Sequence, residues 1–238
     1  MSAPHDLGRD PSGAAPRNGR RTRVGVLISG GGSNMAALIA AAADPAYPAE
    51  IVCVVSNVAT AGGLAKAAAA GIATAVVDHK AHPDRESFER AVVAELEAHG
   101  VELVALAGFM RLLTPWFITR WHDRLINIHP ALLPSYKGLH THARALADGV
   151  KIAGCTVHFV RPEMDVGPIV VQAAVPVLDD DTPDTLAARV LHEEHRIYPL
   201  ALARVASGAA RVVTDADGHE RVVTDGLTAA PAALIAPR

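Results

Sequence analysis

The stretch from Arg23 to Asn34 reads RVGVLISGGGSN, and it decides the fold. Its first part, Arg23 to Ser29, is a short apolar run rich in β-branched residues, which predicts a strand. Residues 30–34 form a glycine loop, after which apolar side chains recur at helical spacing from Met35 to Ala42. A strand, a glycine loop and a helix in this order predict the first unit of an α/β domain.

The same alternation continues along the chain. Further strands are expected at 51–56, 73–77, 102–107 and 124–128, with helices from Thr60 as cap to Gly71, over 84–99 and from Thr114-Pro115. The second half differs, because the strands expected at 152–160 and 169–177 are joined by a turn too short for a parallel crossover. A long helix from Thr182 to about Ala206 and a hairpin around Asp217-Gly218 follow. The predicted class is α/β, a single-domain, Rossmann-like, mainly parallel sheet flanked by helices, with antiparallel strands in the C-terminal half.

Composition narrows the range of partners. The 238 residues are 50% apolar and 20% charged, which suits one compact domain, and the formal net charge of −3 comes without any basic arm for nucleic acid. Apolar runs fall short of the roughly 20 residues that cross a bilayer. Cys53 and Cys155 lie in apolar strands, which favours reduced thiols in the cytoplasm. We therefore expect the partners to be small molecules and expect binding neither to nucleic acid nor to a membrane. A homodimer is possible.

The two ends of the chain differ from its middle. Residues 1–22 are polar and rich in Gly, Pro and Arg, and they are expected to form a disordered extension without a secretory signal. Residues 226–238 are expected to form a C-terminal tail. The catalytic domain is accordingly predicted over 23–225.

The glycine loop predicts an anion site. Its backbone amides and the positive end of the following helix can receive a phosphate. A dinucleotide fingerprint fits less well, because position 35 is Met and the second strand ends in Ser56-Asn57 without an acid for a ribose. The alternative is a tight strand-to-helix turn in which Ser33 or Asn34 caps the helix.

Asn127 and His129 stand where the fifth strand is expected to end, and strand alternation puts both side chains on one face. An amide that donates to an oxyanion, beside an imidazole that acts as general acid, suits acyl transfer. Asp165 lies in the turn between the antiparallel strands. If that turn folds back over His129, the carboxylate would favour the charged imidazole. Otherwise Asp165 is an ordinary turn residue.

Other polar residues carry weaker signals. His140 and His142 flank Thr141 at the predicted start of a helix, where side chains two apart diverge, and no third ligand accompanies them, so no metal is expected. His158 faces either the site or the core. No serine or cysteine has the setting of an activated nucleophile, which favours direct transfer between two bound substrates.

Together these segments resemble the phosphoribosylglycinamide formyltransferases, a folate-dependent family, over about Arg23 to Arg211. The resemblance rests on the following blocks: VLISGGGSN at 26–34, LAGFMR at 106–111, NIHPALLP at 127–134, GLHTH at 138–142 and VHF at 157–159 with Asp165-x-Gly167-Pro168.

The resemblance implies transfer of the formyl group of the co-substrate N10-formyltetrahydrofolate to the amine of 5-phosphoribosylglycinamide in purine biosynthesis. It implies Asn127, His129 and Asp165 as catalytic residues, with Asn127 also contacting folate. The residues it implies for the phosphoribosyl substrate are Gly32, Ser33, Asn34, Gly108, Pro130 and Glu194. Those it implies for folate are Arg85, Met110, Arg111, Leu112 and Leu113.

Three alternatives remain at this point. Methionyl-tRNA formyltransferase and formyltetrahydrofolate deformylase share the Asn-x-His and Asp-x-Gly pattern, but the first carries an added RNA-binding domain and the second a regulatory one. The chain length favours neither. A non-catalytic folate- or nucleotide-binding regulator is the third, and the presence of Asn127, His129 and Asp165 together argues against it.

Overall fold

The computed structural model describes residues 20–226 and Ala236. Nine strands occur in these ranges, at Thr22–Ile28 (β1), Ala49–Ser56 (β2), Ala73–Val76 (β3), Leu103–Leu106 (β4), Leu125–His129 (β5), Ile152–Phe159 (β6), Ile169–Pro176 (β7), Ala210–Thr214 (β8) and Glu220–Thr224 (β9). The helices are Ser33–Ala42 (α1), Gly62–Ala69 (α2), Arg85–Ala98 (α3), Pro115–Arg120 (α4), Thr141–Ala147 (α5) and Pro183–Ala206 (α6), with a short 3-10 turn at His79–Ala81.

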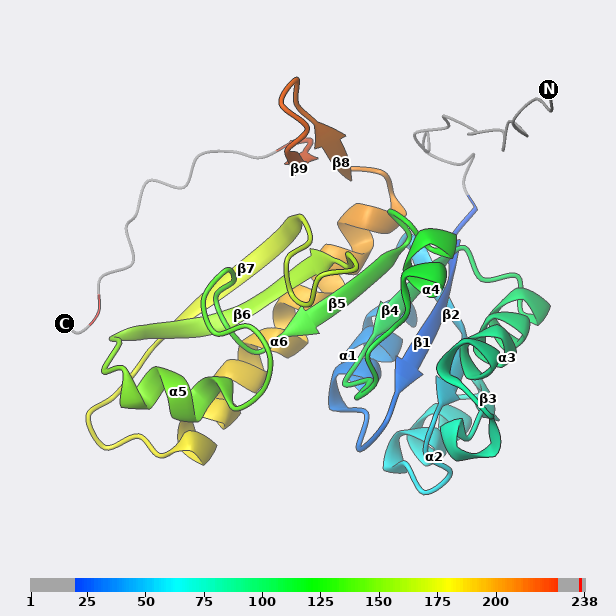
Figure 1. Ribbon diagram of the computed structural model, residues 1–238, viewed down its shortest axis with the longest axis horizontal. Coiled ribbons are helices and arrows are strands. Elements are labelled where there is room, and N and C mark those ends of the chain that lie inside the picture. Colours follow the sequence, from blue (N-terminus) through cyan, green and yellow to red (C-terminus); the bar gives the residue numbers. More distant parts are fainter. Residues whose placement is uncertain (1–19, 227–235, 237–238) are drawn as a thin grey trace.

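Seven strands form one sheet in the order β3-β2-β1-β4-β5-β6-β7. The pairs from β3 to β5 are parallel, whereas β6 pairs antiparallel with both β5 and β7. β8 and β9 form a separate hairpin at one end of the molecule (Figure 1). The predicted class, mainly parallel with antiparallel strands in the second half, is confirmed.

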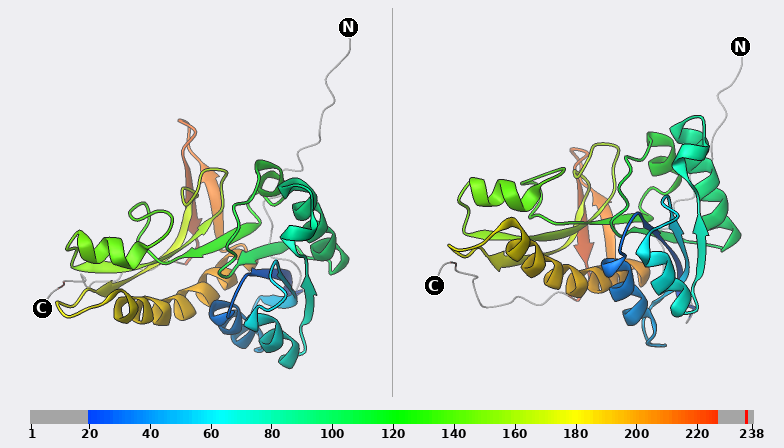
Figure 2. Two further views of the ribbon diagram at one scale, coloured as in Figure 1. Left: turned by 60° about the horizontal axis from the view of Figure 1, so that its bottom comes forward. Right: turned by 90° about the horizontal axis from the view of Figure 1, so that it is seen from below.

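Helices cover both faces of the sheet. The first core lies between the sheet and α1, α2 and α6, where Met35, Leu38 and Val190 are fully buried. The second core lies under α3 and α4, around Phe88 and Trp121. Figure 2 shows α1 and α6 on one side of the sheet and α3 on the other. Because both faces are covered, the parallel strands are nearly continuous apolar runs, as the sequence showed.

The predicted cap of α2 is wrong, and the capping side chain of the alternative interpretation of the glycine loop is also absent. Thr60 does not cap α2, which begins at Gly62 with Ala61 as N-cap and without a capping side chain. Neither Ser33 nor Asn34 caps α1, because Gly32 takes that position in the left-handed conformation, with φ 65°. This conformation suits glycine and disfavours residues with a side chain.

The predicted extension also ends earlier than expected. β1 begins at Thr22, and the Arg21 guanidinium donates to the carbonyl of Ala49 at 2.9 Å. Residues 20–22 therefore belong to the folded part. The rest of the expected N-terminal extension and nearly all of the C-terminal tail lie outside the described residues. Among the helices of the described ranges, none is long and apolar enough to cross a membrane.

Candidate active site

The candidate site lies at the carboxyl ends of parallel strands, where ligands of open α/β sheets bind. The glycine loop follows β1, residues 107–113 follow β4, and β5 ends at His129. The arrows of β1 and β5 point to the same edge of the sheet in Figure 1. The turn between the antiparallel strands β6 and β7 brings Asp165 to this edge as well.

The glycine loop borders a cavity of about 260 Å³, lined by Gly30, Gly31, Gly32, Ser33, Asn34, Lys66, Ala107 and Gly108. The N-terminus of α1 opens at this cavity, so its backbone amides offer a site for an anion. The Lys66 ammonium donates to the Gly31 carbonyl at 2.7 Å and adds a positive charge beside the loop. Sequence reasoning missed Lys66, since a single lysine in an alanine-rich helix gives no signal of its own.

Asn34 and Glu194 meet at one side of this cavity although 160 positions separate them. The Asn34 amide donates to the Glu194 carboxylate at 2.6 Å, and the two residues are only 9% and 6% exposed. Burial raises the pKa of Glu194 above its ordinary value, and the bond from Asn34 offsets part of that effect. Within residues 20–226 the Asn34 carbonyl oxygen has no hydrogen-bond partner. A carboxylate and an amide oxygen together accept hydrogen bonds from hydroxyl groups of a ligand.

Substitution of Glu194 by Gln is expected to stabilise the free protein at neutral pH by a few degrees in Tm. Gln removes a buried charge, and its amide can donate to the unpartnered Asn34 oxygen. Burial raises the pKa of Glu194 in the folded protein above its value in the unfolded chain. Its side chain therefore stabilises the wild type fully below the unfolded-state pKa, and this stabilisation is lost as the pH rises through the folded-state pKa. Thermal unfolding at pH 4 to 8 checks this, and a difference in Tm that fails to shrink toward pH 4 would contradict it.

Gly32 offers a test of the loop geometry. Alanine there would place its Cβ 2.8 Å from the Gly63 Cα in a left-handed backbone conformation, so the loop must shift. We expect Gly32→Ala to raise KM for a phosphorylated substrate about tenfold and to lower stability by about 1 kcal/mol. Gly62→Ala is the matched control, since nothing lies within 4 Å of its added Cβ. An unchanged KM for the Gly32 variant would show that the loop does not hold the phosphate.

His129 and Asp165 lie side by side. His129 Nδ1 is 3.5 Å from an Asp165 carboxylate oxygen, and His129 Nε2 is 2.9 Å from the carbonyl oxygen of Tyr136. Both ring nitrogens thus face acceptors, an arrangement that suits an imidazolium, which donates from both. The same Asp165 oxygen accepts from the Gly138 amide at 2.8 Å, so the segment around Gly138 holds the pair in place.

His158 joins this cluster from β6. Its side chain was expected to face either the core or the site, and it does both, because it is buried and also contacts Asn127. It is 2% exposed, and its Nδ1 lies 3.0 Å from the Phe159 carbonyl oxygen, so Nδ1 carries the proton. Its Nε2 then accepts from the Asn127 amide at 3.3 Å. Burial lowers the pKa of His158, which keeps it neutral and keeps that lone pair available. Neutral His158 therefore orients the Asn127 amide as a donor.

The segment predicted to contact folate borders the same edge. Met110 and Leu112 are 65% and 61% exposed, and the Met110 amide donates to the Ser29 hydroxyl at 2.8 Å. Arg111 and Leu113 are half-buried, and the Arg111 Nε has no partner in the described part of the chain. Arg85 is exposed at the first turn of α3, and its charge acts on Glu89.

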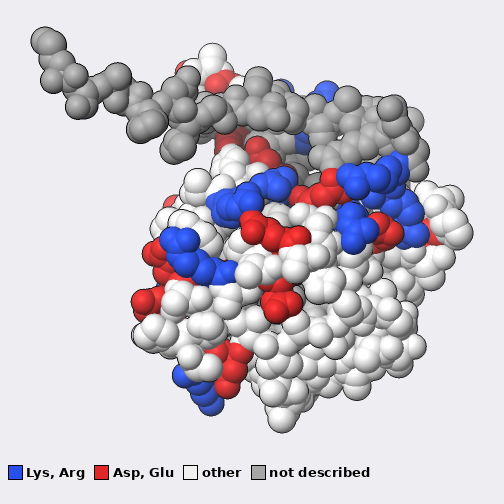
Figure 3. Space-filling view, turned by 90° about the vertical axis from the view of Figure 1, so that its right-hand side faces the viewer, with Lys and Arg blue, Asp and Glu red and all other residues white. Residues whose placement is uncertain are grey.

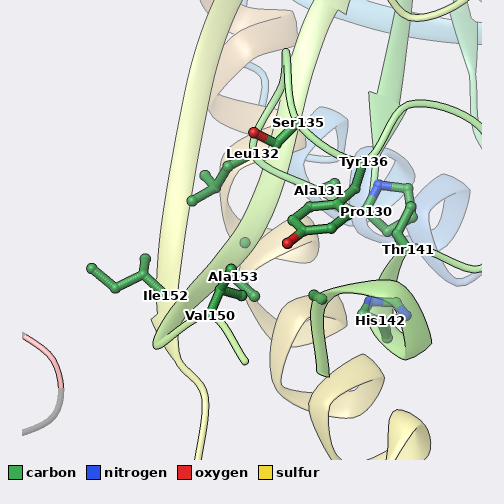
Figure 4. Close-up of a pocket in the computed structure, with 12 residues that line it drawn as sticks. Pro130, Ala131, Leu132, Ser135, Tyr136, Thr141, His142, Val150, Ile152 and Ala153 are labelled. Atoms are coloured by element: carbon green, nitrogen blue, oxygen red, sulfur yellow. The ribbon is translucent and has the colours of Figure 1, made fainter. Parts of the chain in front are cut away.

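Pro130 lines a different cavity from the glycine loop. This second cavity, of about 150 Å³, lies between the segment 130–136, α5 and the start of β6, and the Tyr136 ring points into it (Figure 4). His142 also lines it, and burial lowers the His142 pKa.

His140 is exposed at the N-cap of α5. Two exposed groups of possible metal ligands occur in the described residues, at His122-Asp123-Glu220 and Asp215-Asp217-His219, and neither includes this histidine pair.

Comparison with known proteins identifies the family. The sequence model described as "Formyl transferase" matches residues 22–202, which include every strand of the large sheet and most of α6. The chain belongs to the formyl transferase family. Within this family it is 46% identical to a phosphoribosylglycinamide formyltransferase of Escherichia coli, over 77% of this chain and 86% of that protein.

Two further members extend the comparison. The crystal structure of a phosphoribosylglycinamide formyltransferase from Brucella melitensis is 58% identical, with a TM-score of 0.76, and the match covers 79% of this chain and 97% of the other. A trifunctional purine biosynthetic protein of Homo sapiens is 48% identical over 81% of this chain. The match spans only 19% of that longer relative. The chain is therefore similar to one part of the trifunctional proteins and to nearly the whole of the bacterial ones.

Proposed function

We propose that the chain transfers the formyl group of N10-formyltetrahydrofolate to the amine of 5-phosphoribosylglycinamide. The products are 5-phosphoribosyl-N-formylglycinamide and tetrahydrofolate, in de novo purine biosynthesis. This proposal rests on one observation: Asn127, His129 and Asp165 lie at the same edge of the sheet as the anion cavity at the glycine loop. The names of the bacterial relatives, which cover most of the chain, support the same substrates.

The two substrates occupy neighbouring parts of this edge. The phosphate binds the amides of Gly32, Ser33 and Asn34 with Lys66 beside them, and Glu194 accepts from ribose hydroxyls. Gly108, which lines the glycine-loop cavity, and Pro130, which lines the second cavity but directly follows His129, border the glycinamide part. The folate binds along Met110 to Leu113, where Met110 and Leu112 are mostly exposed, and Arg85 meets an anionic part of that ligand.

The chemistry is a direct acyl transfer. The substrate amine attacks the formyl carbon, and the Asn127 amide donates to the oxyanion that forms. The C–N10 bond then breaks as His129, charged beside Asp165, donates a proton to N10. The attacking amine loses one proton, which is returned to His129, so the ring regains its charge and no net proton is taken up. Before that transfer the His129 Nε2–H must leave the Tyr136 carbonyl, to which it now donates.

We propose residues 20–225 as the catalytic unit, with 226–238 as a tail, small molecules as its partners and the cytoplasm as its location. The face shown in Figure 3 carries acidic and basic side chains interleaved, without a continuous basic patch that would attract a nucleic-acid backbone.

Cys53 and Cys155 are buried and unpaired, and burial raises the pKa of each thiol to about 12. Such inert thiols suit a reducing compartment.

A turnover assay tests the proposal. The folded protein is mixed with N10-formyltetrahydrofolate, with and without 5-phosphoribosylglycinamide, and tetrahydrofolate, formate and the formylated amide are quantified. The proposal predicts tetrahydrofolate only when the amine is present, with an equal amount of amide. Formate released without the amine would indicate a deformylase, and absence of turnover by protein that binds both ligands would indicate a regulator.

A further inference from the structure

The segment Met110–Leu113 is a short irregular connection between β4 and α4. The side chains of Met110 and Leu112 do not fix it, because both are mostly exposed, and only Leu113 packs against the second core. Its two ends are instead held by polar contacts to other elements. The position of this segment therefore depends on the residues that provide those contacts, which we call the Ser29 anchor and the Glu89 anchor.

The Ser29 anchor holds the first end of the segment. The Ser29 hydroxyl accepts from the Met110 amide at 2.8 Å and donates to the Asn57 side-chain carbonyl at 2.6 Å. Next to Met110, the Phe109 ring stacks on Phe88 of α3 with a centroid separation of 6.5 Å. This end is thus tied to the end of β1 and to α3.

The Glu89 anchor holds the second end. Glu89 lies on α3 and is only 1% exposed, and its carboxylate accepts from the Thr114 amide at 2.7 Å and from the Thr114 hydroxyl. A buried carboxylate is unfavourable unless donors satisfy its oxygens. Here both donors come from one residue, the one directly after Leu113. No step of the proposed chemistry uses this carboxylate.

Glu89 also lies one helical turn after Arg85 on α3. The hydrogen bonds from Thr114 to Glu89 therefore join the irregular segment to the helix that carries the exposed arginine. These two parts of the chain are the ones that the proposed function assigns to folate.

We infer that Glu89 is a positioning residue for the folate site, which holds Thr114 so that Met110–Leu113 and Arg85 face one ligand. This inference rests on the proposed function. Removing one of the two hydrogen bonds leaves the segment free to shift relative to Arg85, so folate affinity falls. Glu89 is not among the residues that line the glycine-loop cavity.

Glu89→Leu tests the inference, because leucine is of similar size and has no atom that accepts from either Thr114 donor. Thr114→Val is the second variant, which removes the hydroxyl and keeps the amide. Glu97→Gln is the matched control, since Glu97 joins α3 to Arg120 of α4 at an exposed site away from the segment. The Kd values of tetrahydrofolate and ribose 5-phosphate are measured by calorimetry, and KM and kcat by the turnover assay.

We expect both test variants to raise the Kd of tetrahydrofolate and the KM of the formyl donor about tenfold. The kcat and the Kd of ribose 5-phosphate should stay within about twofold, and the control should match the wild type. Equal losses for both ligands, or an unchanged Kd for tetrahydrofolate, would overturn the inference. Failure of the wild type itself to bind tetrahydrofolate would instead overturn the proposed function.

Discussion

His129→Ala is expected to lower kcat by about 10² to 10⁴ while both substrates still bind. His129 Nδ1 lies 3.5 Å from the Asp165 carboxylate, and its Nε2 faces a carbonyl acceptor at 2.9 Å, whereas the neighbouring His158 is kept neutral by burial. Without it, the departing nitrogen must take its proton from water. The expected signature is a fall in kcat with KM values close to those of the wild type.

Single-turnover and steady-state kinetics on the same preparation check this expectation. Thermal unfolding serves as the control for folding, because His129 is 5% exposed and its loss leaves a small cavity. A variant that keeps its fold and turns over within a fewfold of the wild-type rate would reject the acid role.

Asn127→Ala is expected to lower kcat by about 10² to 10³, the range found when one oxyanion donor is removed. The amide of Asn127 is oriented by neutral His158, at 3.3 Å, so its second N–H can point toward the reacting carbonyl. Asn127→Asp provides a sharper comparison, because it keeps the size and replaces the donor by an acceptor.

The measurement is kcat together with the Kd of ribose 5-phosphate. If Asn127 acts on the oxyanion, the Asp variant is as impaired as the Ala variant and the Kd is unchanged. If Asn127 merely fills space, the Asp variant retains most of the wild-type kcat, and the proposed role is wrong.

The sequence predicted those parts of the fold that depend on local patterns. Apolar runs, the glycine loop and the Thr114-Pro115 start of α4 carry their signals within a few residues. Strand alternation likewise placed Asn127 and His129 on one face. The alternative in which Ser33 or Asn34 caps α1 is wrong, because a left-handed Gly32, rather than a polar side chain, occupies the cap position.

Contacts between distant segments were beyond that reasoning. Spacing alone could not show that the turn after β6 folds back and brings Asp165 to His129. Resemblance named Glu194 as a substrate residue, but its contact with Asn34 needs the packing of α6 beside α1. Glu89 and Lys66 gave no signal, because each looks like an ordinary charged residue of a helix until its partner is known.

The central claim is direct formyl transfer at the Asn127, His129 and Asp165 cluster. The most direct test is a single turnover with excess protein and N10-formyltetrahydrofolate labelled in the formyl carbon, quenched at intervals and separated into amide, formate and protein fractions. The account predicts that the label leaves the folate at the rate at which it enters the amide, with none on the protein or in formate. Label that first accumulates on the protein, or that is released as formate, would contradict it.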